Sequence, residues 1–310
     1  MSARKKNMAA SIKQRLLDRS RIRKEDVQLL LIRYGLERFL YRLGYSDYRQ
    51  RFILKGAMLF PYWEIDEHRP TRDIDLLGFG ESAAAELAEV VREVLSLEIE
   101  DDGLQFDLNS ISAEEIREDL EYGGVRIKFN AYLEQARIGL QIDIGFGDIV
   151  SPEPQEIIYP SLFDLPAPRI RAYPRETVLA EKFHAMVILG MGNSRMKDFY
   201  DVWILARLFE FDGQLLARAI EQSFVRRKTE VPTSPPLAFC EEFYGDSSKQ
   251  AQWRAFWNRN KLTGDFVSLE KTVALISGFL MPLCTAVTSG QQIVTQWPPG
   301  GDWEPFRETD

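Results

Sequence analysis

The chain contains 310 residues, of which 45% are hydrophobic and 28% charged, and its formal net charge is −8. This composition favours a globular protein with two or three packed units, and two cysteines and two histidines are too few for a zinc site or a Ser-His-Asp triad. No apolar segment follows the early lysines, and the apolar run 273–284 is interrupted by Ser277, Gly278 and Pro282, so we expect a cytoplasmic protein that does not span a membrane.

The first 51 residues are basic, with fourteen Lys or Arg against five Asp or Glu, a net charge of +9. Apolar residues between Leu16 and Leu40 recur at helical spacing, which predicts helices. Two interpretations remain open for this segment. It is either a packed helical cap with a solvated basic face, or a surface that meets the phosphate backbone of RNA.

A strand-like run, 52–55, ends at Gly56 and is followed by an apolar segment that can begin a helix. A strand, a small-residue turn and a helix N-terminus together present backbone N–H groups and a positive dipole to a phosphate. An ordinary tight turn is the alternative.

Two aspartates follow in the segment Thr71–Leu76. Asp73 and Asp75 are two residues apart, so in a strand they share one face while Ile74 and Leu76 are buried on the other. Paired carboxylates suit a hard cation such as Mg²⁺. Solvated or turn-forming carboxylates are the alternative. The nearby Gly78-Phe79-Gly80 does not match a dinucleotide-binding fingerprint, and the chain has no Walker A motif.

A hairpin is predicted from 125–133 and 137–146. The second segment alternates strictly, with Ile142 and Ile144 on the apolar face and Asp143 on the polar face. We expect Asp143 to share one sheet with Asp73 and Asp75.

A helix is predicted from Glu176. Lys182 falls within its apolar arc, so it either extends to water or meets an anion, whereas His184 falls outside the arc and is expected at the surface or a domain junction. A purely structural Lys182 should tolerate replacement by methionine. On the next helix, Asp198 and Asp201 either cap the first turn or form part of a site.

These motifs together resemble the nucleotidyltransferase superfamily, and within it the AbiEii/AbiGii toxin-like family, which includes the MenT-type toxins. The resemblance rests on Leu54-Lys55-Gly56, on the segment 69–76, and on the blocks 176–182 and 193–201. It covers roughly residues 50–207. Two features depart from the family pattern: Ala57 replaces the usual second Gly or Ser of the turn, and the loop from Gly56 to Asp73 is long.

The resemblance implies an α+β fold with a nucleotidyltransferase-type mixed β-sheet core, a helical N-terminal segment and a mostly helical C-terminal domain. It implies Mg²⁺-dependent transfer of a nucleoside monophosphate from an NTP, at a site that holds two metal ions. The expected acceptor is the 3′ end of tRNA, and the expected partner is an antitoxin encoded nearby. The implied residues are Asp73, Asp75 and Asp143 as metal ligands and catalytic residues, Lys182 and Asp198 as further catalytic residues, and Lys55, Gly56, Ala57, Thr71 and Lys182 as nucleotide-binding residues.

We expect three parts: a basic helical segment (1–51), a catalytic core (52–150) and a mostly helical domain that completes the active site (151–310). Two other functions remain open. One is a nucleotidyltransferase that modifies a small molecule such as an aminoglycoside, or a protein hydroxyl. The other is a non-catalytic interaction module.

Overall fold

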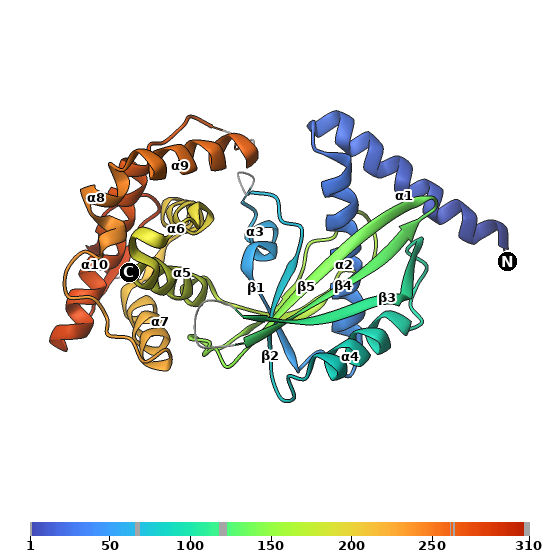
Figure 1. The fold of residues 1–310 in the computed structure, drawn as a ribbon, viewed down its shortest axis with the longest axis horizontal. Coiled ribbons are helices and arrows are strands. Elements are labelled where there is room, and N and C mark those ends of the chain that lie inside the picture. The colour runs from blue at the N-terminus through green and yellow to red at the C-terminus, as the bar shows by residue number, and fades with distance from the viewer. Residues whose placement is uncertain (1, 66–68, 118–122, 261, 263, 307–310) are drawn as a thin grey trace. The chain divides into compact units, whose positions relative to one another are not determined.

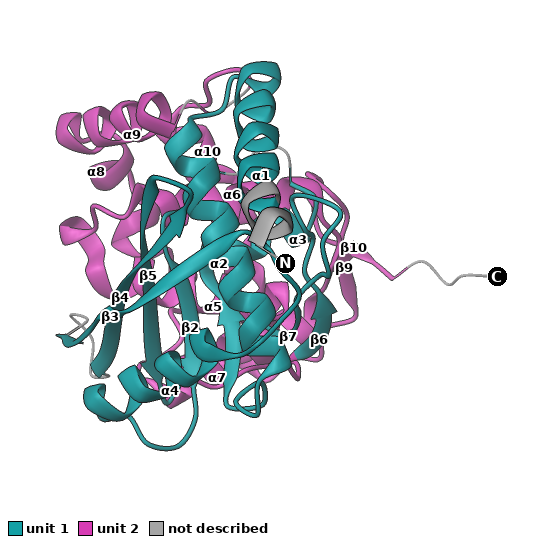
Figure 2. Ribbon diagram, turned by 90° about the vertical axis from the view of Figure 1, so that its right-hand side faces the viewer, with its two compact units in different colours: residues 1–147, 155–172 teal, residues 148–154, 173–310 magenta. Residues whose placement is uncertain are grey.

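The computed structural model describes residues 2–65, 69–117, 123–260, 262 and 264–306 (Figure 1). His68 lies outside the described residues. The chain divides into two compact units, of which unit 1 contains residues 1–147 and 155–172, and unit 2 contains residues 148–154 and 173–310 (Figure 2). The N-terminal helices therefore belong to the same unit as the β-sheet. The three-part division by function stays a prediction.

Unit 1 is built on a seven-stranded sheet with the order β3-β4-β5-β2-β1-β7-β6. The pairing is mixed, because β2 is parallel to β5 and antiparallel to β1. The strands are β1 (Phe52–Lys55), β2 (Ile74–Gly78), β3 (Leu104–Arg117), β4 (Gly123–Leu133), β5 (Ala136–Phe146), β6 (Gln155–Ile158) and β7 (Arg169–Ala172). This arrangement confirms the expected mixed-sheet α+β fold.

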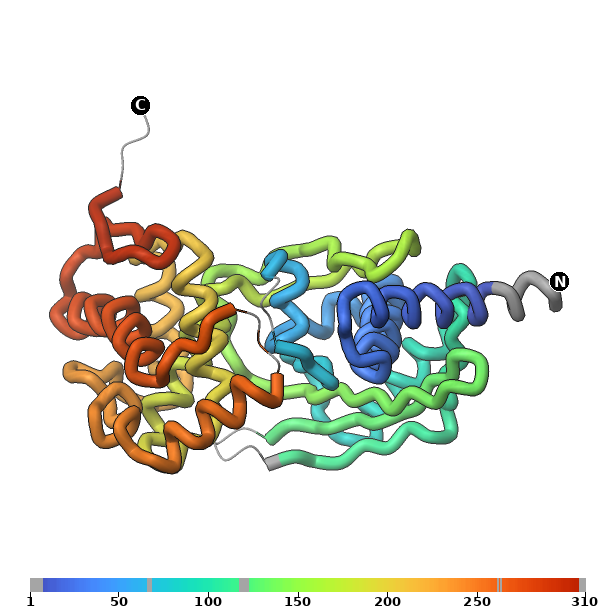
Figure 3. The backbone as a smooth tube through the Cα atoms, turned by 90° about the horizontal axis from the view of Figure 1, so that it is seen from above, coloured from blue at the N-terminus to red at the C-terminus, as the bar shows by residue number. Residues whose placement is uncertain are grey.

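The predicted hairpin is confirmed as β4 and β5, two long neighbouring strands in green in Figure 3. Its pairing closes with Leu133 opposite Ala136. Along β5, Ile138, Leu140, Ile142 and Ile144 are all buried. Burial of one face fixes the strand register, because a shift by one residue would turn these side chains to the polar face.

In the described part of unit 1, the helices beside the sheet are α1 (Ser2–Arg23), α2 (Val27–Tyr45), the short α3 (Leu59–Tyr62), which follows the 3-10 turn Gly56–Met58, and α4 (Ala84–Ser96). Asp26 caps α2, since its carboxylate accepts a hydrogen bond from the Leu29 N–H at 3.0 Å. Helix α2 packs against β5 and β7, and α4 packs against β3. Both helices cover the apolar surface of the sheet.

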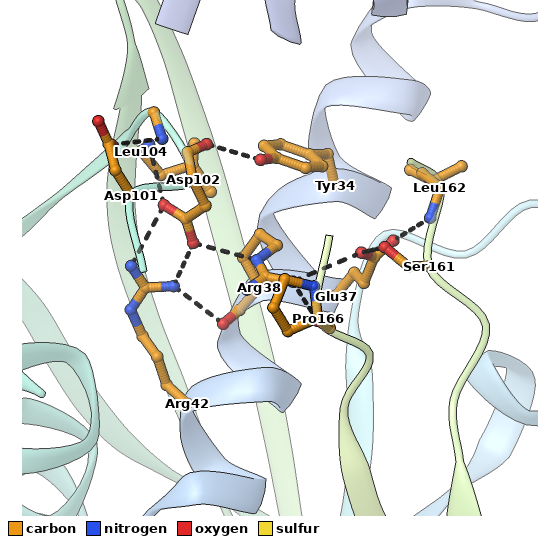
Figure 4. A network of polar contacts seen from close by, with 11 residues as sticks. Tyr34, Glu37, Arg38, Arg42, Asp101, Asp102, Leu104, Ser161, Leu162 and Pro166 are labelled. Carbon is orange, nitrogen blue, oxygen red and sulfur yellow. Dashed lines mark hydrogen bonds and ion pairs between the residues drawn. The ribbon is translucent and has the colours of Figure 1, made fainter. Parts of the chain in front are cut away.

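A buried polar network fastens α2 to the start of β3 (Figure 4). Asp102 accepts hydrogen bonds from Arg38 Nε at 3.0 Å and from Arg42 Nη1 at 2.7 Å, and Tyr34 donates its hydroxyl hydrogen to the Asp102 carbonyl at 2.6 Å. Next to Arg38 in the sequence, Glu37 accepts a hydrogen bond from the Ser161 hydroxyl at 2.6 Å. Burial raises the pKa of Glu37, while the Ser161 hydrogen bond opposes that rise. Two of the N-terminal cations are therefore part of the core of unit 1.

Unit 2 is mostly helical, with a small three-stranded sheet of order β10-β9-β8. Its elements are α5 (Arg175–Leu189), the 3-10 turn Gly190–Gly192, α6 (Met196–Leu208), β8 (Phe211–Asp212), α7 (Gly213–Arg226), the 3-10 turn Leu237–Phe239, α8 (Glu241–Tyr244), α9 (Ser247–Asn260), α10 (Leu269–Ser289), β9 (Thr295–Trp297) and β10 (Glu304–Pro305). Aromatic rings fill the space between α6 and α9, where Tyr200 contacts Phe256 and Trp257. This cluster anchors α6, which carries Asp198 and Asp201.

Helix α10 is the one described helix whose length and composition would allow it to cross a membrane. Core helices of globular proteins meet the same two criteria. One stripe of α10, including Ile276 and Leu280, is buried within unit 2. From the same stripe, the Phe279 ring packs against Trp297 with a centroid distance of 4.7 Å. The apolar face of α10 thus has partners inside unit 2.

His184 is buried, with an exposed fraction of 2%, so the expected surface position was wrong. The apolar-arc argument treated α5 as packed on one side, but α5 contacts both α6 and α7. His184 Nε2 lies 3.0 Å from the Thr229 hydroxyl, and the imidazole meets the Phe224 ring edge-on. Burial, assisted by the nearby Arg227 charge, lowers the pKa of His184 to about 4.

This lowered pKa predicts a loss of stability in acid. The unfolded chain binds a proton at His184 below about pH 6.5, whereas the folded chain does not until about pH 4. The contribution of neutral His184 to the free energy of unfolding should therefore be fully present above about pH 6.5. The free energy of unfolding should decrease by about 2–3 kcal/mol on acidification to pH 4. Urea unfolding of the wild type and His184→Gln over this range measures the effect. An equally steep pH dependence in both proteins would contradict the assignment.

Candidate active site

Five charged residues lie side by side across one face of the sheet in unit 1. In the strand register, Lys55 is opposite Asp75, Asp75 is opposite Asp143, Asp143 is opposite Arg126, and Arg126 is opposite Glu114. Directly paired residues point to the same face of a sheet. We call these five residues the charged row. The register brings Asp75 and Asp143, which sequence reasoning placed on separate strands of one sheet, onto neighbouring strands.

Asp73 lies just outside β2, which begins at Ile74, so its predicted position within the strand was wrong. Strand β1 ends at Lys55 opposite Asp75, and the chain then turns at Gly56. Among the described residues, Asp75 is therefore the first residue of β2 that pairs with β1. The Thr71 hydroxyl donates a hydrogen bond to Asp73 Oδ1 at 2.6 Å, which orients this half-buried carboxylate.

The turn after β1 fits closely against the Asp75 carboxylate. Gly56 has a φ of +72°, and a Cβ atom at this residue would overlap Asp75 Oδ2. Both features require glycine. Ala57 is buried, so its side chain belongs to the core. The turn therefore brings backbone to the carboxylate, as a phosphate-binding turn next to a metal site would need.

Gly56→Ala is expected to destabilise unit 1. The substitution imposes a left-handed φ on an L-residue and forces its methyl group against Asp75, at a cost of about 1–3 kcal/mol. Gly139→Ala on β5 is a matched control, because a Cβ atom there meets no heavy atom within 4 Å. Urea unfolding compares the two variants. Equal stability of both would show that the Gly56 turn adjusts without strain.

The Lys55 side chain extends along the same face as the charged row. Its Nζ lies 3.7 Å from the position that a Cβ atom of Gly145 would occupy. Gly145 is two residues beyond Asp143 on β5, so the ammonium group reaches across β2 to the strand that carries Asp143. The absence of a side chain at Gly145 leaves room for this cation.

Asp143 is held by two neighbours that sequence reasoning missed. Arg126 donates Nε–H to Asp143 Oδ1 at 2.8 Å and Nη2–H to Oδ2 at 2.7 Å. The Gln141 amide lies 3.2 and 3.3 Å from the same two oxygens. The hydrogen bond with Asp143 raises the pKa of Arg126. The pair is therefore a charge-assisted, bidentate ion pair on neighbouring strands.

The donor chemistry of Asp73 and Asp75 fits Mg²⁺, which prefers carboxylate oxygens and commonly takes one or two of them together with substrate phosphates. Within the described ranges, no three His, Cys, Asp or Glu side chains gather closely enough to form a ready metal site. Asp75, which lies against the glycine turn, and Asp73, two residues before it, remain a suitable partial site. The assignment of Asp73, Asp75 and Asp143 as metal ligands stays a prediction.

Lys182 belongs to an ion cluster within unit 2. Its Nζ lies 2.8 Å from Asp198 Oδ1 and 2.8 Å from Asp201 Oδ2, and Arg195 Nε lies 2.7 Å from Asp198 Oδ2. Asp198 and Asp201, three residues apart on one face of α6, are fully buried, and Lys182 is only 11% exposed. Lys182 therefore meets anions rather than extending to water. Their role in a reaction stays a prediction.

Charge within this cluster determines the ionisation of Asp198. Burial alone would raise the pKa of this carboxyl, but the nearby charges of Lys182 and Arg195 outweigh burial, and the pKa is lowered. Asp198 is therefore ionised at neutral pH. It lies in the first turn of α6 as predicted, yet its carboxylate contacts cationic side chains, so capping does not account for its position.

The basic helix α1 carries ion pairs on its surface. Lys13 lies 2.9 Å from Glu134, Arg15 lies 3.5 Å from Asp164, and Arg21 lies 3.3 Å from Asp18. Exposed pairs of this kind are weak and exchange readily with other anions. The contacts fit a packed helical cap, and contact with RNA stays a prediction.

Comparison with solved structures finds two similar proteins from Helicobacter pylori. A candidate nucleotidyltransferase is 13% identical, with a TM-score of 0.46 over 86% of this chain and 97% of its own. JHP933 is 14% identical, with a TM-score of 0.46 over 85% of this chain and 93% of its own. A search of curated proteins finds no match.

Comparison with protein families finds a match over residues 38–265, which is most of the chain. The matching family is described as nucleotidyl transferase AbiEii toxin, type IV toxin–antitoxin system. The matched range includes the Gly56 turn, Asp73, Asp75, Asp143 and the Lys182 cluster. The chain therefore belongs to the AbiEii family of nucleotidyltransferase toxins, and it is a nucleotidyltransferase.

Proposed function

We propose that the chain transfers a nucleoside monophosphate from an NTP to a hydroxyl group of RNA, at the sheet face that carries the charged row. The observation that carries this proposal is the pairing of Asp75 with Asp143 on neighbouring strands, with the Gly56 turn packed against the Asp75 carboxylate. Nucleotidyl transfer needs carboxylate oxygens for Mg²⁺ next to donors for the triphosphate. Both kinds of group are available on this face.

In this mechanism, Asp73 and Asp75 hold Mg²⁺. When bound, the ion supplies positive charge for the phosphate oxygens and lowers the pKa of the attacking hydroxyl. Thr71 keeps the Asp73 carboxylate in orientation through its hydrogen bond at 2.6 Å. The Gly56 backbone and the Lys55 ammonium group would bind triphosphate oxygens. These residues position the substrate and stabilise charge, and no covalent intermediate with the protein is needed. The acceptor hydroxyl oxygen bonds to the α-phosphorus, the bond from that phosphorus to pyrophosphate breaks, and pyrophosphate and the hydroxyl proton leave to solvent.

Membership of a type IV toxin–antitoxin family implies an antitoxin partner and an NTP substrate. For the acceptor, we propose the 3′ end of tRNA, as the family resemblance implies. The basic α1 surface supports an RNA acceptor, because its exposed ion pairs can exchange carboxylates for phosphates. Because this surface is positively charged, it would repel a small cationic acceptor such as an aminoglycoside.

One experiment tests the reaction and the acceptor together. Each of four labelled NTPs is incubated with the full chain and Mg²⁺, in separate reactions containing total RNA, purified tRNA, a protein extract or an aminoglycoside. We expect label from one preferred NTP at the 3′ end of tRNA, and no transfer when EDTA is present. Label confined to protein or aminoglycoside would replace the RNA proposal, and no label in any acceptor would contradict transfer altogether.

A further inference from the structure

The bidentate pair between Arg126 and Asp143 occupies the oxygen atoms that a metal ion would need. Both Asp143 oxygens accept from Arg126, at 2.8 and 2.7 Å, and both lie within 3.3 Å of the Gln141 amide. The Asp143 side chain is 13% exposed and that of Arg126 is 33% exposed. The pair is therefore well shielded on the Asp143 side, where competition from water is weakest.

A guanidinium and a divalent cation compete for the same carboxylate. Mg²⁺ binds single oxygen atoms in near-octahedral geometry, whereas the planar guanidinium engages both oxygens at once. Arg126 also brings a positive charge to the position opposite Asp143, and like charge opposes the approach of a second cation. A metal ion that binds Asp143 would have to displace the Arg126 guanidinium from the carboxylate. The ion would then still be repelled by the positive charge of Arg126 nearby.

We propose that Arg126 is a positioning residue that keeps Asp143 from binding metal, so that the protein without nucleotide holds one divalent ion, at Asp73 and Asp75. This inference rests on the proposed function, because it assumes that those two aspartates form the metal site. Arg126 is a fixed part of β4. It then supplies Asp143, the third carboxylate, with the positive charge that a second metal ion would otherwise supply.

Binding of Mn²⁺ to the full chain without nucleotide tests this inference. Electron paramagnetic resonance measures free Mn²⁺ during a titration and gives both the number of bound ions and their affinity. We expect one bound ion in the wild type. In Arg126→Met, the released Asp143 should add a second bound ion or increase the affinity about tenfold, because one cation is removed and one carboxylate is freed.

Lys128→Met is the matched control. Lys128 is two residues from Arg126 on β4, so it lies on the same face, but it pairs with Glu114 at 2.7 Å and is 51% exposed. The Lys128→Met substitution removes one positive charge, as Arg126→Met does, but it does not free Asp143. Mn²⁺ binding to this variant should equal that of the wild type. Arg126→Met/Asp143→Asn should also return to wild-type binding. Circular dichroism and thermal unfolding establish that each variant is folded, and Arg126→Lys provides a milder replacement.

Any of four results would overturn the inference: two ions bound by the wild type, no gain in folded Arg126→Met, an equal gain in Lys128→Met, or a gain that persists in the Arg126→Met/Asp143→Asn variant. In the last case Asp143 would not be the new ligand. The readout involves no nucleotide. Failure of the transfer assay together with a gain in Arg126→Met would therefore remove the proposed reaction and leave the role of Arg126 intact.

Discussion

Asp75→Asn is expected to reduce nucleotidyl transfer by about 10³-fold or more while leaving the fold intact. Asp75 combines the features that a metal ligand needs: it lies on the polar face of β2, opposite Asp143, and the Gly56 turn contacts its carboxylate. Asparagine keeps the shape but removes the charge that holds Mg²⁺ and offsets its cost of dehydration. Transfer of labelled nucleotide to tRNA, at saturating NTP and Mg²⁺, measures the loss.

Glu114→Gln is the control for Asp75→Asn. Glu114 is the far member of the charged row on β3, and it forms an exposed pair with Lys128. The substitution makes the same chemical change on the same face, and transfer should stay within about twofold of the wild type. Similar losses of transfer activity in the two variants would mean that the charged row acts through its total electrostatic field, and not through metal binding by Asp75. Full activity of folded Asp75→Asn would remove the metal site from β2.

Local pattern was enough to predict the elements that carry the carboxylates. Alternation of apolar residues predicted β5, and the same signal with a short connection predicted the β4–β5 hairpin. The predicted second strand began at 137, whereas in the structure Leu133 pairs with Ala136 across a two-residue loop. This difference of one residue sets the register, which places Arg126 opposite Asp143. The partner of Asp143 therefore could not be predicted from the sequence pattern alone.

Other features depend on contacts between distant segments. No local signal indicates that β2 inserts between β1 and β5, and this insertion places Asp75 opposite Asp143. Strands β6 and β7 follow a proline-rich segment, are four residues each and still join the sheet of unit 1. Strand β3 carries many charged residues and has a register shift between Asp107 and Ser112, which weakens its alternation. Tertiary pairing determines these elements more than their own residues do.

The Lys182 cluster is another contact between separate segments that the sequence pattern did not reveal. Sequence placed a cation within an apolar arc and an aspartate pair on the next helix, but it could not establish that they meet. The expected tolerance of Lys182→Met assumed that the ammonium group reached water. Because Lys182 instead lies between two buried carboxylates, the structure reverses the expected effect of this substitution on stability.

Lys182→Met is now expected to destabilise the protein by about 3–5 kcal/mol at neutral pH, the cost of removing the cation from between two buried carboxylates. Asp198 retains Arg195, at 2.7 Å, but loses the ammonium group that it shares with Asp201. Without Lys182, burial of Asp198 is opposed mainly by Arg195, so the pKa of Asp198 should rise from its value in the folded wild type. The folded variant then takes up a proton more readily than the folded wild type, so its stability deficit should shrink as the pH falls.

Urea unfolding at pH 7 and pH 5 measures this effect, with Lys182→Arg as the charge-conserving control. The triple variant Lys182→Met/Asp198→Asn/Asp201→Asn should recover most of the stability, because it removes the two buried negative charges together with the cation. This rescue separates an electrostatic cost from a packing cost, since methionine occupies the same space in both variants. A loss in Lys182→Met that is equal at both pH values and not recovered in the triple variant would identify packing, rather than charge, as the contribution of Lys182.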